Sequence, residues 1–144
     1  MEQRTNIAEM LPSSYKAMYD LSITVNKSSL TPIQKELIKI RASQINRCAY
    51  CLHMHTSDAL NAGEKKERIF LLTAWNESDL FSKEEKAMLA IVEEVTIIHN
   101  KGLSDATYQE AQNFFNEEEI AEIIMSTVVI NAWNRIAIST NLPF

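Results

Sequence analysis

Two cysteines separated by two residues, Cys48 and Cys51, have the greatest capacity for chemistry in this chain, and His55 lies four positions after the second. On a helix that starts near Cys48, about 100° of rotation per residue places Cys51 roughly 60° and His55 roughly 20° away from Cys48. The three side chains therefore share one face. His53 falls near the opposite side, so we expect His55 to meet the thiols.

The cysteines lie in the first turn of this predicted helix, where unpaired backbone N–H groups and the positive end of the helix dipole stabilise a thiolate. The thiolate is the nucleophile, and an imidazole one turn further on can take its proton. A second thiol three residues away can form a disulfide once the first sulfur has been oxidised to a sulfenic acid. The spacing supplies a nucleophile, a base and a resolving thiol, which indicates a dithiol redox centre.

Glu36 is the candidate third group of the site. It belongs to the preceding predicted helix and lies at the edge of its apolar stripe, where a carboxylate needs a partner. If the two helices pack antiparallel across the short connection at residues 46–47, Glu36 could approach His55 and orient its imidazole. Asp58, one turn after His55, is a rival for this orienting role.

Two other interpretations of the cysteine pair remain open. Cys48, Cys51 and His55 could bind zinc together with His53 or His99, but structural zinc usually takes four ligands, and a second Cys-x2-Cys pair is missing. The cysteines could also be buried and unreactive, because a free cysteine packs as a small apolar residue. We expect neither a metal nor a cofactor.

The elements that position these residues are helices. The chain has only two glycines and three prolines, and few segments alternate as strands do. Thr31, Pro32 and Gln34 combine an N-cap, a proline at N1 and a capping-box partner. Gly63 is placed to end the cysteine-bearing helix. We expect an all-α bundle of about six to seven helices, over residues 14–27, 31–45, 48–62, 67–74, 82–99, from about 104, and 116–139.

The last of these helices carries apolar residues nearly all round, so it must be buried on most sides, by its own domain or by another subunit. Its polar residues need partners, and we expect them to form hydrogen bonds between helices. They are Thr127, Asn131, Asn134 and Arg135.

Length and composition place limits on the function. With 144 residues, 46% hydrophobic and 23% charged, residues 1–144 are expected to form a single globular domain. A net charge of -5 without a basic stripe argues against a nucleic-acid partner. A secretory signal and a membrane-spanning segment are not evident, so we expect a cytoplasmic protein with no membrane partner.

The pattern Glu-x11-Cys-x2-Cys-x3-His between Glu36 and His55 resembles the signature of the alkylhydroperoxidase D and carboxymuconolactone decarboxylase superfamily. The segments 37–46 and 130–136 look like its single-domain branch, and the similarity covers roughly residues 30–138. The resemblance implies an AhpD-like all-α fold, assembly into homo-trimers or homo-hexamers, and peroxidase activity that uses a dithiol or protein reductant.

The resemblance also implies roles for the site residues. Cys51 would be attacked by peroxide, Cys48 would resolve the sulfenic acid as a disulfide, and His55 and Glu36 would form the relay that activates the thiol. One position departs from the family pattern: where characterised members have a histidine before the second cysteine, this chain has Tyr50. A tyrosine can donate a hydrogen bond but is a poor base near neutral pH.

Two other functions use the same fold. One is a non-redox oligomeric protein that binds a small molecule near Cys51, and the other is a decarboxylase-like lyase. Family members without the cysteine pair include decarboxylases, so the pair favours the hydroperoxide-reducing enzyme over the lyase.

Overall fold

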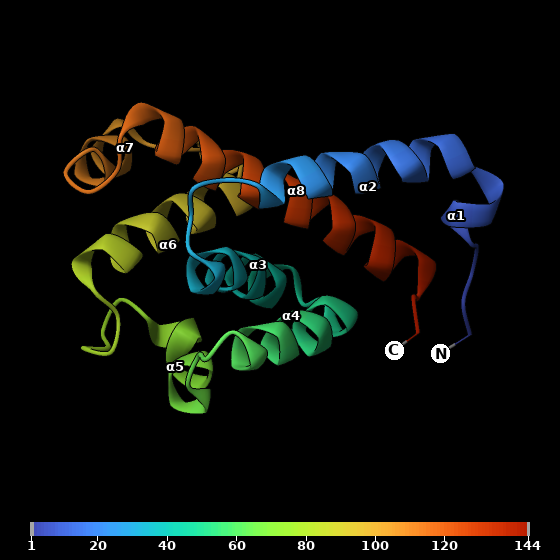
Figure 1. Ribbon diagram of the computed structural model, residues 1–144, viewed down its shortest axis with the longest axis horizontal. Helices are drawn as coiled ribbons and strands as arrows, with labels where there is room; N and C mark the ends of the chain where they lie inside the picture. Colours follow the sequence, from blue (N-terminus) through green and yellow to red (C-terminus); the bar gives the residue numbers. More distant parts are fainter. Residues whose placement is uncertain (1, 144) are drawn as a thin grey trace.

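The computed structural model describes residues 2–143, and within them it contains helices and no strand (Figure 1). The α-helices are α1 (Ile7–Met10), α2 (Pro12–Asn26), α3 (Pro32–Asn46), α4 (Ala49–Asn61), α5 (Lys66–Leu71), α6 (Lys83–Thr96), α7 (Asp105–Ala111) and α8 (Glu117–Thr140), and a 3-10 turn at Leu72–Ala74 follows α5. The all-α prediction is confirmed. The short helix α1 was not predicted.

Local capping explains where the longer helices begin. The hydroxyl of Thr31 accepts a hydrogen bond from the N–H of Gln34, and the N–H of Thr31 donates to the side-chain oxygen of Gln34, which forms the predicted capping box of α3. α6 and α8 begin in the same way at Ser82 and Asn116. Helix α4 ends before Gly63, whose φ of +96° suits a glycine because a side chain is disfavoured there.

Helix α6 ends at Thr96, before the predicted end near His99. The reason is a tertiary contact. The carboxylate of Glu94 accepts hydrogen bonds from the N–H of Ser104, at 2.6 Å, and from the hydroxyl of Thr107, at 2.7 Å. The chain must therefore reverse direction within a few residues of Thr96, and His99 lies exposed in the connection.

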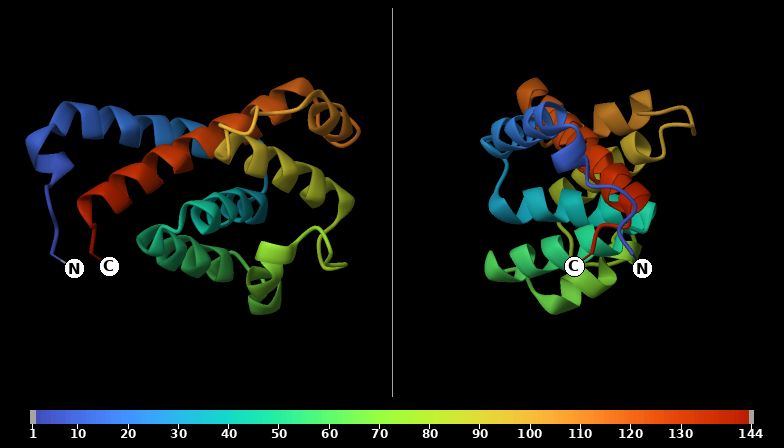
Figure 2. Two further views of the ribbon diagram at one scale, coloured as in Figure 1. Left: turned by 180° about the vertical axis from the view of Figure 1, so that it is seen from behind. Right: turned by 90° about the vertical axis from the view of Figure 1, so that its right-hand side faces the viewer.

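Helix α3 lies at the centre of the bundle and contacts α4, α6 and α8 (Figures 1 and 2). Its apolar face and those of α6 and α8 form one core. The fully buried side chains include Leu37, Ile38, Ile40, Met88, Leu89, Ile91, Val92, Ile120 and Ile123. Helix α8 is both a core helix and a surface helix, because Met125, Val128 and Ile138 on it are 40–45% exposed.

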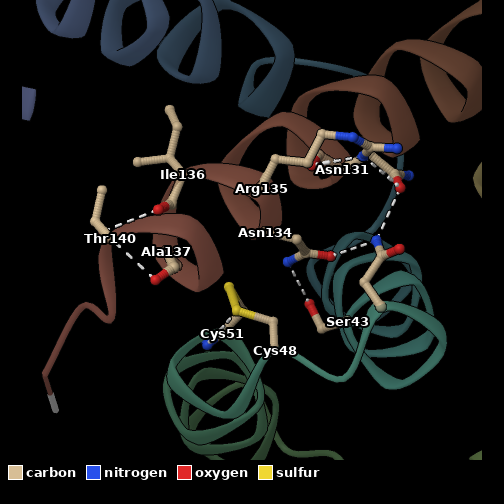
Figure 3. The surroundings of a disulfide bond; sticks show 10 residues. Ser43, Cys48, Cys51, Asn131, Asn134, Arg135, Ile136, Ala137 and Thr140 are labelled. Atoms are coloured by element: carbon tan, nitrogen blue, oxygen red, sulfur yellow. Dashed lines mark hydrogen bonds between the residues drawn. A yellow bond between two sulfur atoms is a disulfide. The ribbon is translucent and has the colours of Figure 1, made fainter. Parts of the chain in front are cut away.

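A buried polar layer holds the end of α3 against α8. The side-chain amide of Asn46 donates to the side-chain oxygens of Asn131 and Asn134, both at 2.8 Å. Asn134 in turn donates to the hydroxyl of Ser43 at 3.0 Å, and Asn131 donates to the hydroxyl of Thr96 at 3.0 Å. The predicted hydrogen bonding between helices is confirmed for Asn131 and Asn134, but it is wrong for Thr127 and Arg135, which donate to Ile123 and Asn131 of α8 itself. These contacts position the connection that leads into α4 (Figure 3).

The N-terminal helices pack along the C-terminal half of α8. The ring of Tyr15 meets that of Trp133 edge to face at 5.3 Å, and the indole N–H of Trp133 donates to the hydroxyl of Ser22 at 2.7 Å. The N–H of Arg4 donates to the carbonyl of Thr140 at 2.9 Å, so the two ends of the described chain lie side by side (Figure 2). Among residues 2–143, no helix is long and apolar enough to cross a membrane.

Candidate active site

The cysteine pair forms a disulfide at the start of α4. Cys48 is the N-cap residue and Cys51 lies in the first turn, with their Cα atoms 5.4 Å apart. The backbone N–H of Cys51 points to Cys48 Sγ at 3.4 Å, so the sulfur occupies the place of a capping oxygen. Both side chains are buried, and Figure 3 shows the disulfide facing the last turns of α8. The pair is therefore in its oxidised form and inside the protein.

His55, which the helical spacing predicts to share a face with the cysteines, lies on the buried face of α4. Cys51, His55 and Ala59 are the buried residues of this helix, whereas His53 is exposed. Cys51 and His55 are four residues apart, so their side chains lie one above the other on the same face.

Glu36, from the second turn of α3, holds the imidazole of His55. Its Oε2 lies 2.9 Å from His55 Nδ1, and its Oε1 accepts a hydrogen bond from Lys39 Nζ at 2.7 Å. Burial on its own raises the pKa of Glu36, but the hydrogen bonds from His55 and Lys39 outweigh it and the pKa lies below the ordinary carboxyl value. Glu36 is therefore a carboxylate at neutral pH.

The charge of Glu36 decides which tautomer His55 adopts. A carboxylate only accepts hydrogen bonds, so the proton of a neutral His55 must be on Nδ1. The other ring nitrogen, Nε2, then carries the lone pair that can act as a base. In this geometry Glu36 can orient the ring and Nε2 can accept a proton.

Asp58 lies further from the imidazole than Glu36. Its Oδ2 is 3.9 Å from His55 Nδ1, and its side chain is 53% exposed, so it adds little to the orientation of the ring. Within residues 2–143, the one cluster of metal-type donors consists of Glu36, His55 and Asp58 and contains neither cysteine. The ammonium group of Lys39 is paired with the same Glu36 carboxylate, which makes the cluster less attractive to a cation.

A pocket of about 360 Å³ opens over Cys51 and His55. We call it the Cys51 pocket. It lies between α1, α2, α4 and α8, and Cys48 does not line it. Its walls are mostly apolar or aromatic and include Tyr15, Tyr19, Met54, Val129, Trp133 and Ile136, while Lys39 and Tyr50 also line it.

The sequence interpretation missed Lys39 and the walls of the pocket. The signal for Lys39 was available, because it lies three residues after Glu36 and therefore on the same side of the helix. The pocket walls had no local signal, since α2 and the end of α8 are far from Cys51 in the chain and meet it only through packing.

Comparison with known proteins places this arrangement in a family. The sequence pattern described as "Carboxymuconolactone decarboxylase family" matches residues 12–94. An uncharacterised Bacillus subtilis (strain 168) protein, YdfG, is 42% identical over 139 residues, which cover 96% of this chain and 95% of that protein.

Solved structures share the fold. A protein of unknown function from Agrobacterium tumefaciens, named as a candidate antioxidant defence protein AhpD, is 35% identical with a TM-score of 0.95, and the match covers 99% of this chain and 97% of that one. A peroxidase-related protein with an alkylhydroperoxidase AhpD core, from Ralstonia eutropha JMP134, has a TM-score of 0.83 at 18% identity over 94% of this chain and 73% of that one, which supports the fold alone. Because the family pattern spans more than half of its length and the Bacillus relative nearly all of it, the chain belongs to the carboxymuconolactone decarboxylase family.

Proposed function

We propose that this protein is a thiol-dependent peroxidase that reduces hydroperoxides through a cycle between the Cys48–Cys51 disulfide and the two thiols. The observation that carries the proposal is that Cys51 and His55 line one pocket while Glu36 Oε2 lies 2.9 Å from His55 Nδ1. A candidate nucleophile and a candidate base therefore adjoin a space that can hold a substrate, and Glu36 holds the base from behind. Family membership and the name of the Agrobacterium relative agree with this chemistry.

In the proposed cycle, His55 Nε2 takes the proton of the Cys51 thiol. The thiolate attacks one oxygen of the hydroperoxide, the O–O bond breaks, and the departing alkoxide takes the proton from His55 to leave as an alcohol. Cys51 is now a sulfenic acid. Cys48 Sγ attacks the sulfur of Cys51, hydroxide leaves with the proton of Cys48 as water, and the disulfide forms. A dithiol or protein reductant supplies the two electrons that return the pair to thiols.

The capped position of Cys48 supports its role as the resolving residue. The backbone N–H of Cys51 that points to Cys48 Sγ stabilises negative charge on that sulfur, as the start of a helix does in general. Cys48 is also outside the Cys51 pocket, so a bound peroxide meets Cys51 first.

The proposal is tested by following sulfenic acid and thiols by mass spectrometry after the reduced protein is mixed with hydrogen peroxide. We expect the wild-type chain to lose two thiols and gain one disulfide. The Cys48→Ser variant should stop at a Cys51 sulfenic acid that reacts with dimedone, and Cys51→Ser should remain unmodified. Two thiols that persist at modest peroxide excess in the wild-type chain would refute the proposal.

We also infer that the protein works as a homo-oligomer, with a trimer or a hexamer as the expected form. The exposed apolar side chains of Met125, Val128 and Ile138 on α8 support this, because another copy of the chain would remove them from water.

A further inference from the structure

The two cysteines of the disulfide line two different pockets. A second pocket of about 350 Å³, which we call the Cys48 pocket, lies between the start of α4 and the end of α8 and its following residues. Cys48 lines it and Cys51 does not, whereas Cys51 lines the Cys51 pocket and Cys48 does not. Tyr50, Ala137 and Leu142 line both pockets, so the two pockets are neighbours that have different cysteines in their walls.

This arrangement matters because a thiolate attacks a disulfide along the S–S axis, from the side opposite the sulfur that leaves. Attack on Cys48 must therefore come from the Cys48 side and expel Cys51. Attack on Cys51 would have to come from the side of the peroxide pocket and expel Cys48. The ease with which a thiol can reach each sulfur helps to decide which sulfur is attacked. Here a thiol would approach Cys48 through one pocket and Cys51 through the other.

The Cys48 pocket also has a distinct charge. Of the residues that the structure describes, Arg47 is the only charged residue that lines it, and its side chain is exposed. Among residues 2–143, no carboxylate forms an ion pair with this guanidinium. In the Cys51 pocket, by contrast, the charge of Lys39 is neutralised by Glu36. Within the described part of the chain, an anion therefore meets an unpaired guanidinium on the Cys48 side and an already paired ammonium group on the Cys51 side.

Arg47 is held at this place by the backbone. It has a left-handed conformation, with φ +59° and ψ +41°, and it links the end of α3 to the N-cap of α4. Such a conformation is uncommon for a residue other than glycine. A glycine at position 47 would adopt this left-handed conformation with less strain than an arginine does. The chain nevertheless has a long cationic side chain there.

We propose that the reductant of this protein is an anionic dithiol that binds in the Cys48 pocket beside Arg47 and attacks Cys48 Sγ. This inference rests on the proposed redox cycle, because it assigns the half-reaction that regenerates the thiols. The attacking thiol loses its proton to solvent, its thiolate forms a mixed disulfide with Cys48, the Cys48–Cys51 bond breaks, and Cys51 leaves as a thiolate that takes a proton back from solvent. The second thiol of the reductant then attacks the first, releases Cys48 with a proton, and departs as a disulfide.

The site of attack can be trapped with a monothiol, which cannot complete the second step. The oxidised protein is mixed with 3-mercaptopropionate for short times and quenched with N-ethylmaleimide, and fragment masses locate both groups. We expect mercaptopropionate on Cys48 and N-ethylmaleimide on Cys51. Mercaptopropionate found mainly on Cys51 would overturn the proposal. The experiment uses no peroxide, so its outcome is independent of whether the protein proves to be a peroxidase.

The role of Arg47 is tested by the charge dependence of the same step. Rates of disulfide reduction are measured with anionic 3-mercaptopropionate, neutral 2-mercaptoethanol and cationic cysteamine. For each thiol the rate in the variant is divided by the rate in the wild type, so that the intrinsic reactivity of the thiol cancels. For Arg47→Gln we expect the mercaptopropionate rate to fall roughly fivefold, the factor for two unit charges about 4 Å apart in water. The cysteamine rate should rise and the mercaptoethanol rate should hardly change. The effects should shrink in high salt.

Two variants serve as controls. Arg47→Lys has the same backbone cost and retains the charge, so it should keep the preference for the anionic thiol. Lys66→Gln removes a positive charge from the exposed start of α5, outside both pockets, and should change none of the three rates. Equal slowing of all three thiols in Arg47→Gln would show that Arg47 acts only on structure and would refute its role in binding.

Discussion

The substitution Glu36→Gln separates the proposed relay from a merely buried ion pair. The carboxylate of Glu36 accepts hydrogen bonds from His55 Nδ1 at 2.9 Å and from Lys39 Nζ at 2.7 Å, and its side chain is only 12% exposed. An amide of the same shape keeps one oxygen acceptor, so one of the two contacts is lost and an N–H₂ group must face Lys39 or the imidazole.

The size of the effect follows from these contacts. A hydrogen bond to a charged group contributes about 1.5–3 kcal/mol to stability, so we expect Glu36→Gln to lower the free energy of unfolding by about 2 kcal/mol at pH 7. The base also loses the partner that selects its tautomer. General acid–base catalysis contributes roughly 10²–10⁴ in rate, and we expect the oxidation of Cys51 to slow by at least about tenfold.

The stability effect should depend on pH in a defined direction. The pKa of Glu36 is lower in the folded chain than its ordinary value of 4.5, so near that pH the unfolded state binds more protons than the folded state. The stabilisation from Glu36 is therefore complete above pH 4.5 and is lost as the pH falls through the folded pKa. The difference between wild type and Glu36→Gln should stay large above about pH 5 and shrink in more acidic solution.

The assay combines urea denaturation of the oxidised protein at several pH values with rapid-quench thiol titration of the reduced protein in peroxide. Asp58→Asn is the matched control, because Asp58 lies 3.9 Å from the same nitrogen but is half exposed. Asp58→Asn should lower the free energy of unfolding by less than about 1 kcal/mol and keep the rate of Cys51 oxidation within a few fold of the wild-type rate. Equal losses in Glu36→Gln and Asp58→Asn would refute the assignment of Glu36 as the orienting group.

Three further predictions concern the framework. Asn134→Ala removes partners from Asn46 and Ser43 in the buried polar layer, so we expect it to lower the free energy of unfolding by about 2–3 kcal/mol in urea denaturation. Trp133→Phe breaks the hydrogen bond to Ser22, and amide hydrogen exchange in α2 should accelerate while that in α3 is unchanged. Val128→Glu places a charge on the exposed apolar face of α8, and light scattering should show a smaller assembly than for the wild type; an unchanged mass would exclude this face as the subunit contact.

Much of the fold was predictable because its signals are local. Thr31, Ser82 and Asn116 satisfy the free N–H groups of helix starts with their own side chains, and this requirement is independent of distant parts of the chain. The end of α6 was not predictable in this way. The contact between Glu94 and Ser104 brings together residues on two different elements, and it reverses the chain before the local pattern ends.

The same distinction applies to the site. The helical period alone determined that Cys51 and His55 share a face of α4, because four residues make about one turn. Only the packing of α3 against α4 decided that Glu36, rather than Asp58, lies in hydrogen-bond contact with the imidazole. Likewise, only the packing of α2 and α8 over α4 decided that the two cysteines line different pockets. Spacing along one helix depends on backbone geometry, whereas a pocket depends on side chains that tertiary structure brings together from distant parts of the sequence.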